Sequence, residues 1–205
     1  MKKLSIVFLL LTAASPAFAQ WGGGLKAGLN IANFVGDDAD GSDPRIAYHI
    51  GGYLNTSISD MISFQPELLI SSVGSKTKES GTDPDLGDYS VEANAKLTYV
   101  TLPLMFVFNL NESVNLQAGP QLGVLASAKL EYDIESDFIT MSGTEDVKEQ
   151  FKAVDVGINA GVGANFGLIN ATLRYSLSLM EIGEEDGAIK NSVIQISLGY
   201  KIVKK

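Results

Sequence analysis

Few residues of this 205-residue chain have side chains suited to catalysis or metal binding. His49 is the only histidine and there is no cysteine, so nucleophilic catalysis with a histidine base would have to use His49. Ser57, Ser63 and Ser71 stand at odd-numbered positions, as His49 does, which would place them on the same face of an extended strand region. No nucleophile motif surrounds these serines. A zinc site usually needs several His or Cys ligands. We therefore predict no catalytic residue, metal site or cofactor, and we expect His49 to be a hydrogen-bonded interior side chain.

Three short segments resemble ligand-binding loops without matching them. Asp38-Ala-Asp40-Gly-Ser-Asp43 supplies carboxylates of the kind that bind calcium, but it lacks the distant glutamate of an EF-hand. Gly81-Thr-Asp83-Pro-Asp85 has the same composition and the same interpretation. Gly22-Gly-Gly24 lacks the Lys-Ser/Thr that follows in a phosphate loop. We interpret the two acidic segments as solvated turns and the glycines as the start of a strand.

Apolar residues alternate with polar or small residues over long stretches of the chain. In the segment 114–132 the even positions are apolar and the odd positions are mostly polar or glycine, as expected where side chains alternate across a strand. The segments with this pattern are Leu25–Asn33, Ile46–Ile58, Ile62–Val73, Val100–Leu110, Val114–Tyr132, Val154–Phe166, Ile169–Met180 and Ile194–Ile202. We predict an all-β chain of about eight strands, the small end of the known transmembrane barrels.

The connections between these segments alternate between short and long. The short ones are Ser59-Asp60, Asn111-Glu112-Ser113 and the break at Gly167-Leu168. The long ones are Val35–Pro44, Gly74–Ala95, Asp133–Gln150 and Glu181–Asn191. Acidic residues gather in the long loops, including Asp37, Asp38, Asp40, Asp43, Asp83, Asp85, Asp88, Glu184, Glu185 and Asp186. This order predicts an eight-stranded antiparallel up-and-down barrel with short periplasmic turns and longer outer loops.

Strand parity predicts which polar side chains lie inside the barrel. They are Lys26, His49, Glu67, Gln117, Gln121, Lys129, Glu131, Asp155, Asn159 and Arg174. Charges enclosed in a narrow barrel must be paired or hydrogen-bonded, and we expect Glu67 to pair with Arg174 or with Lys26. We interpret the set as a structural polar plug; the alternative is a gated pore or a buried catalytic group.

Three features favour a membrane barrel over a soluble, lipocalin-like carrier. The polar face is rich in Gly, Asn, Gln and Ser rather than Lys and Glu, which suits a narrow lumen. The segment 114–132 is longer than usual soluble strands. Phe64, Phe108, Phe166 and Tyr200 share the apolar parity and lie near short turns or the C-terminus, where an aromatic girdle would form.

The N-terminus predicts export. Met1-Lys2-Lys3, the apolar stretch from Leu4 to Ala14 and Ala17-Phe18-Ala19 fit a secretory signal peptide, so we expect residues 1–19 to be removed and residues 20–205 to form the barrel domain. The apolar run of about 11 residues is too short to span a bilayer, which needs about 20. A formal net charge of -9 disfavours nucleic acid as a partner.

Several motifs resemble a known family. They are Gly24-Leu-Lys-Ala-Gly-Leu-Asn30, Gln65-Pro-Glu-Leu-Leu69, Tyr99-Val-Thr-Leu-Pro-Leu104, Ala118-Gly-Pro120 and Gly161-Val-Gly163. The mature sequence resembles the PorT-like outer-membrane β-barrel family of Bacteroidota. The resemblance implies an eight-stranded barrel in the lipid bilayer, inserted by the outer-membrane assembly machinery, and it implies no activity.

Our leading hypothesis is a structural or surface-interaction protein of the outer membrane whose acidic loops contact a surface partner. The alternatives are a narrow pore or secretion-associated barrel, a soluble lipocalin-like carrier, and a lipid-modifying enzyme. The enzyme would require a Ser/His/acid group near one rim, and we see none in the sequence.

Overall fold

The computed structural model describes residues 21–83, 87–136, 138–183 and 188–203. The predicted signal peptide lies outside these residues, as do Asp85 and the acidic run Glu184-Glu185-Asp186. The described chain consists of strands and one short 3-10 helix. In order they are β1 (Gly22–Val35), β2 (Asp43–Ser57), β3 (Ile62–Asp83), β4 (Gly87–Asn109), β5 (Val114–Ser136), β6 (Thr140–Asp146), η1 (Lys148–Gln150), β7 (Val154–Phe166), β8 (Ile169–Ser178) and β9 (Lys190–Val203). No helix in these ranges is long and apolar enough to cross a membrane.

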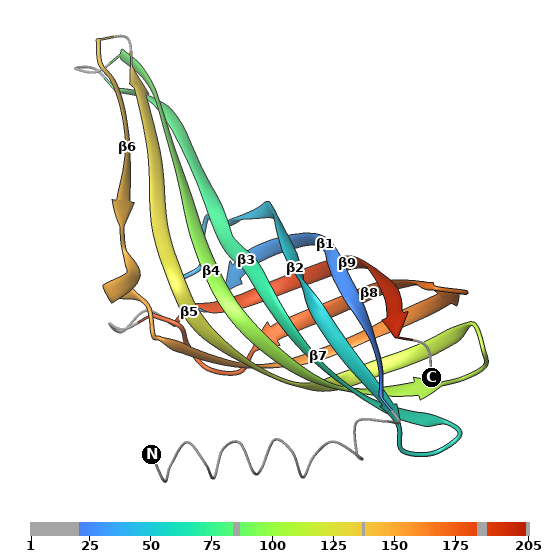
Figure 1. Cartoon of the computed structure of the whole chain (residues 1–205). Coiled ribbons are helices and arrows are strands. Elements are labelled where there is room, and N and C mark those ends of the chain that lie inside the picture. The colour runs from blue at the N-terminus through green and yellow to red at the C-terminus, as the bar shows by residue number, and fades with distance from the viewer. Residues whose placement is uncertain (1–20, 84–86, 137, 184–187, 204–205) are drawn as a thin grey trace, which may run out of the picture.

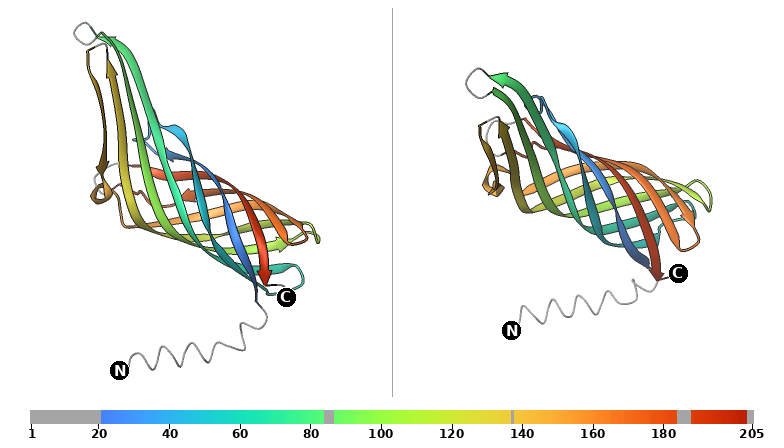
Figure 2. Two further views of the ribbon diagram at one scale, coloured as in Figure 1. Left: turned by 45° about the horizontal axis from the view of Figure 1, so that its top comes forward. Right: turned by 90° about the horizontal axis from the view of Figure 1, so that it is seen from above.

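Eight of the nine strands close into a ring (Figures 1 and 2). Neighbouring strands from β1 to β5 pair antiparallel, β5 pairs with β7, and β9 returns to pair with β1. β7, β8 and β9 complete the circuit in sequence order. The remaining strand, β6, pairs with β5 outside the ring. The predicted eight-stranded up-and-down barrel is confirmed, and β6 is an addition to it.

The apolar residues of each ring strand point outward and the polar residues point into the lumen. On β9, Ile196 and Leu198 are 50% and 63% exposed, whereas the intervening Ser197 is 2% exposed. Apolar positions of adjacent strands lie side by side: Leu173 on β8 is opposite Val162 on β7 and Ile196 on β9. Because the same alternation runs around the ring, its outer surface is a continuous apolar band, the reverse of a soluble barrel.

The short connections and both ends of the barrel domain lie together. The turns comprise residues 58–61, residues 110–113 and Gly167-Leu168. Gly167 has φ +64, the left-handed conformation that a two-residue hairpin turn requires and glycine adopts readily. Gly23 at the start of β1 lies opposite Val203 at the end of β9. We call this the short-turn end; it is at the lower right in Figure 1.

The opposite end carries a sheet that projects beyond the ring (Figure 1). The expected loop Gly74–Ala95 is mostly strand, since β3 and β4 stay paired as far as Asp83 and Gly87. Within the expected loop Asp133–Gln150, β6 pairs with β5 from Lys129 to Glu135. The loop prediction was wrong here because both faces of these strands meet water, so they lack the apolar row that marks the ring. We call residues 77–83, 87–93, 128–136 and β6 the projecting sheet.

An apolar cluster closes the lumen at the end where the projecting sheet begins. We call it the apolar cap; its buried members are Ala32, Phe34, Val73, Leu97, Tyr99, Leu125, Ala128, Val147, Ile182 and Val193. Val147 and Ile182 belong to the connections that follow β6 and β8. Backbone hydrogen bonds hold both in place, from Val147 N to Ala128 O (3.1 Å) and from Ile182 N to Ile189 O (2.9 Å).

Candidate functional site

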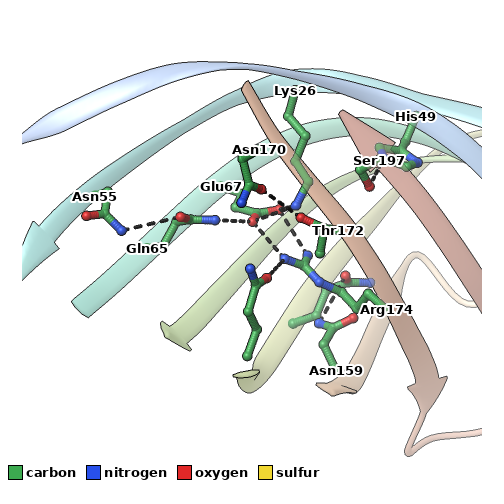
Figure 3. A network of polar contacts seen from close by, with 12 residues as sticks. Lys26, His49, Asn55, Gln65, Glu67, Asn159, Asn170, Thr172, Arg174 and Ser197 are labelled. Atoms are coloured by element: carbon green, nitrogen blue, oxygen red, sulfur yellow. Dashed lines mark hydrogen bonds and ion pairs between the residues drawn. The ribbon is translucent and has the colours of Figure 1, made fainter. Parts of the chain in front are cut away.

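A buried ion network crosses the middle of the lumen (Figure 3). Its centre is the Glu67 carboxylate on β3. Lys26 Nζ on β1 lies 3.0 and 3.2 Å from the two carboxylate oxygens. Arg174 on β8 donates from Nη1 and Nη2 at 3.0 and 2.8 Å, a bidentate contact. Gln65 Nε2 donates to the same carboxylate at 2.8 Å, and Gln117 Oε1 accepts from Arg174 Nη2 at 2.9 Å.

The network joins β1, β3 and β8 inside the ring. The side chains of Glu67 and Arg174 are 0% exposed and that of Lys26 is 3% exposed. Unpaired charges in such a place are very costly, whereas charges that are paired and fully hydrogen-bonded are tolerated. Our prediction left open whether Glu67 pairs with Lys26 or Arg174; in the structure it contacts both. Two cations and one carboxylate leave the network with one surplus positive charge.

His49 on β2 belongs to a second hydrogen-bonded group. Its Nδ1 lies 2.7 Å from Asn30 Oδ1, and its Nε2 lies 2.8 Å from Ser197 Oγ. Asn30 Nδ2 donates to Ser71 Oγ at 3.0 Å and to the Ser72 carbonyl at 2.8 Å, which leaves Asn30 Oδ1 as the acceptor. The imidazole proton is thereby assigned to Nδ1, and Nε2 accepts from Ser197.

The Ser197–His49–Asn30 group has the order of contacts found in serine hydrolases, where a histidine takes the proton of a serine hydroxyl. Sequence reasoning missed Ser197 because the pairing of β1 with β9, which brings it near, joins opposite ends of the chain. Asn30 stands four residues after Lys26 on β1, so the alternation of side chains along the strand could have predicted that it faces the lumen. Ser197 is only 2% exposed, which leaves its hydroxyl closed to a substrate in this structure.

The other predicted interior residues occupy separate positions along the lumen. Asp155 Oδ2 accepts from Ser178 Oγ at 2.8 Å and from Asn191 Nδ2 at 3.2 Å. Asn159 Nδ2 donates to Gln121 Oε1 at 3.3 Å. These residues form local hydrogen bonds rather than joining the central network, and Asp155 Oδ1, Asn159 Oδ1 and Asn191 Oδ1 have no hydrogen-bond partner among the described residues. In the described chain, no group of three or more His, Cys, Asp or Glu side chains could hold a metal ion.

Lys129 and Glu131 do not lie in the lumen as predicted. The register of β5 against β4 shifts between Thr98 and Tyr99, which leaves Ala126 as an extra residue in β5. Such a bulge reverses the parity of every following residue. Leu125 before the bulge and Ala128 after it are both buried, and Lys129 is exposed. Glu131 is 38% exposed and forms an ion pair with Lys96 of β4.

The four aromatic residues predicted to form a girdle lie near the short-turn end. Phe166 and Tyr200 are 66% and 53% exposed, and the strand pairings place Ile169 between them. Phe108 is 41% exposed, and Phe64 packs on Phe106 with ring centroids 5.5 Å apart. Two outward-facing tyrosines that we did not predict, Tyr48 and Tyr175, are 59% and 45% exposed and lie farther from that end on β2 and β8.

The projecting sheet presents exposed apolar residues and an open strand edge. Phe138, Ile139 and Met141, at and beside the start of β6, are 76%, 51% and 54% exposed. β6 pairs with β5 along one edge, and no described strand pairs with its other edge. Lys78 and Glu92 form an ion pair across β3 and β4. Hydrogen bonding to Glu92 raises the pKa of Lys78, although solvent screens this exposed pair.

The sequence of the chain assigns the barrel to a family. The family model described as "Outer membrane protein beta-barrel domain" matches residues 16–183. The chain belongs to this family. The protein is therefore located in the outer membrane, and its apolar band faces the lipid bilayer. A comparison with curated protein sequences finds no match.

Solved structures similar to this outer-membrane barrel share little sequence with it. Ail, the attachment invasion locus protein of Yersinia pestis, is 13% identical with a TM-score of 0.48, covering 89% of this chain and 99% of that chain. Neisserial surface protein A is 9% identical with a TM-score of 0.43, covering 89% and 97%. The N-terminal β-barrel domain of Pseudomonas aeruginosa OprF is 14% identical with a TM-score of 0.38, covering 88% and 99%.

Proposed function

We propose that this outer-membrane barrel is a surface-interaction protein and that its projecting sheet is the contact surface. The observation that carries the proposal is the open edge of β6 next to exposed Phe138, Ile139 and Met141. An unpaired strand edge offers backbone hydrogen bonds to a partner strand, and nearby apolar residues add buried area. From Thr77 to Asp83 the sheet extends about 23 Å beyond the last β2 pairing, at ~3.3 Å per residue.

The interior of the barrel supports a structural plug rather than a pore or an enzyme. The apolar cap lies across one end of the lumen and the ion network crosses its middle. The Ser197 hydroxyl, which would be the nucleophile of an enzyme, is buried. A conducting state would require both the cap and the network to move.

We further propose that the mature protein begins at Gln20 after removal of residues 1–19, and that residues 20–205 form one barrel domain. The assembly machinery of the outer membrane would insert it, and Phe64, Phe108, Phe166 and Tyr200 would lie at the periplasmic lipid interface. The finer assignment to PorT-like barrels of Bacteroidota rests on the sequence motifs. The acidic long loops remain a second candidate contact surface.

A trimmed variant tests the surface-interaction role. Residues 77–93 of β3 and β4 are replaced by an Asn-Gly turn, and residues 129–146 of β5 and β6 by a short linker. We expect this barrel to stay folded, with unchanged cell resistance to detergent, while adhesion of producing cells to protein-coated surfaces falls to the level of cells lacking the protein. Full adhesion with increased detergent sensitivity would contradict the proposal and favour a purely structural role.

A further inference from the structure

The lumen opens into a cavity at the short-turn end. Its volume is about 330 Å³, and it is walled by strand ends from around the ring. This volume lies at the lower end of the range for small-molecule sites, about 300–1,000 Å³. The ion network and the apolar cap separate it from the other end of the lumen. We call this cavity the vestibule; the short-turn end of outer-membrane barrels faces the periplasm.

The lining of the vestibule consists largely of carboxamides. They include Asn55, Gln65, Asn109, Asn115, Asn165 and Asn170. Each carboxamide has two donors and an acceptor oxygen with two lone pairs, which is more than its protein partners use here. The lining contains no acidic residue, and Lys201 is its one charged side chain among the described residues.

Two side chains of the lining have unused hydrogen-bonding capacity. Asn115 Oδ1 accepts from Gln117 Nε2 at 2.9 Å, and the Asn115 amide protons have no partner among the described residues. Tyr53 is also in the lining, but its hydroxyl, which has no hydrogen-bond partner among the described residues, is buried beneath the cavity surface. Gly163 leaves space for the Asn115 side chain, since a Cβ at Gly163 would lie 2.5 Å from Asn115 Oδ1.

The inner wall of the vestibule adjoins the ion network. Gln65 of the lining donates to Glu67, and Gln117 of the lining accepts from Arg174. The surplus positive charge of the network therefore acts on the vestibule through a low-dielectric interior. Together with Lys201 at the other side, this charge favours a ligand that carries one negative charge.

We propose that the vestibule binds a singly anionic, hydroxyl-rich small molecule of the sugar-acid class from the periplasmic side. Its hydroxyls would exchange hydrogen bonds with the carboxamides, which match groups that both donate and accept. Its carboxylate would be held by Lys201 and by the field of the ion network. The site lies at the opposite end from the projecting sheet and is independent of the surface-interaction role.

The test is a binding titration of the full mature barrel in detergent micelles. Glucuronate and glucose are titrated separately, and binding is measured by calorimetry or by saturation-transfer NMR. We expect saturable glucuronate binding at least tenfold tighter than glucose binding. Asn115→Leu and, as a second variant, Asn109→Leu should each weaken glucuronate binding at least tenfold. Lys201→Gln should weaken glucuronate binding while leaving glucose binding unchanged. Gln150→Leu removes an exposed carboxamide at the far end and should change neither.

Each variant is first shown to be folded by its heat-modifiable mobility on a gel. Absence of saturable binding to the wild-type barrel would overturn the proposal. Equal binding of glucose and glucuronate would overturn its charge component, and so would unchanged glucuronate binding by folded Lys201→Gln. An acidic tetrapeptide that binds as tightly as glucuronate would show that the vestibule does not select hydroxyl-rich ligands, which also contradicts it.

Discussion

Removal of the negative charge at Glu67 tests the physical role of the ion network. Glu67→Gln preserves the shape of the side chain but leaves Lys26 and Arg174 as two buried cations without a counter-charge. Removing one partner of a buried ion pair costs about 3–5 kcal/mol. Here the Glu67 carboxylate accepts four contacts from the two cations and one from Gln65. We therefore expect the loss of folding free energy in Glu67→Gln to lie in the upper part of that range. The unfolding equilibrium should shift by about 1,000-fold or more.

Two companion variants separate charge balance from simple packing. Lys26→Met leaves the bidentate Arg174–Glu67 pair, which is neutral, so its cost should stay within about 1 kcal/mol. Glu92→Gln removes the carboxylate of the exposed Lys78–Glu92 pair and should cause no measurable change, since solvent screens it.

The assay is urea-induced unfolding of the barrel in lipid vesicles, followed by the fluorescence of the single tryptophan, Trp21, and by gel mobility without heating. The expected order of stability is wild type and Glu92→Gln, then Lys26→Met, then Glu67→Gln. The reasoning is refuted if Glu67→Gln unfolds at the wild-type urea concentration, or if Lys26→Met is as destabilising as Glu67→Gln.

Three further outcomes follow from the structure. Leu173→Arg places a charge on the lipid-facing side of β8 and should cost about 2–4 kcal/mol of folding free energy in vesicles, while Met141→Arg on the projecting sheet should cost nothing measurable. Deletion of Ala126 removes the extra residue and leaves Leu125 and Ala128 buried and Lys129 outside in a regular alternation, so the folded yield in vesicles should stay close to that of the wild type; a strongly reduced yield would count against Ala126 as the extra residue. The folded protein should not react with a fluorophosphonate probe, because Ser197 is buried; labelling that disappears in Ser197→Ala would contradict a non-enzymatic role.

The ring strands could be predicted from the sequence because lipid and lumen impose opposite demands on alternate residues. Ile194, Ile196 and Leu198 alternate with Gln195 and Ser197 for this reason. The same alternation predicted that Lys26, Glu67 and Arg174 all face the lumen. The projecting sheet could not be predicted in this way. Its strands have water on both faces, so the segment Gly74–Ala95 reads as a polar loop.

The bulge in β5 was hidden by the composition around it. Ala128 and Leu130 continue the even apolar series that starts at Val114, and nothing in that series shows that Ala126 is an extra residue. After the bulge the apolar row packs into the cap instead of facing lipid, and Lys129 and Glu131 are carried to the other face. The His49 group was missed in part because Ser197 comes from the last strand, and only closure of the ring brings β9 beside β1.

Cysteine labelling on intact cells tests the membrane topology most directly, because the native chain has no cysteine to interfere. Single cysteines are placed at Met141 in the projecting sheet, Leu173 in the apolar band and Ser113 in a short turn, and exposed to a membrane-impermeant maleimide. We predict labelling of Met141→Cys on intact cells, labelling of Ser113→Cys only after the cells are opened, and protection of Leu173→Cys in both cases. Labelling of Ser113→Cys on intact cells with protection of Met141→Cys would contradict the orientation, and labelling of all three would contradict a barrel embedded in lipid.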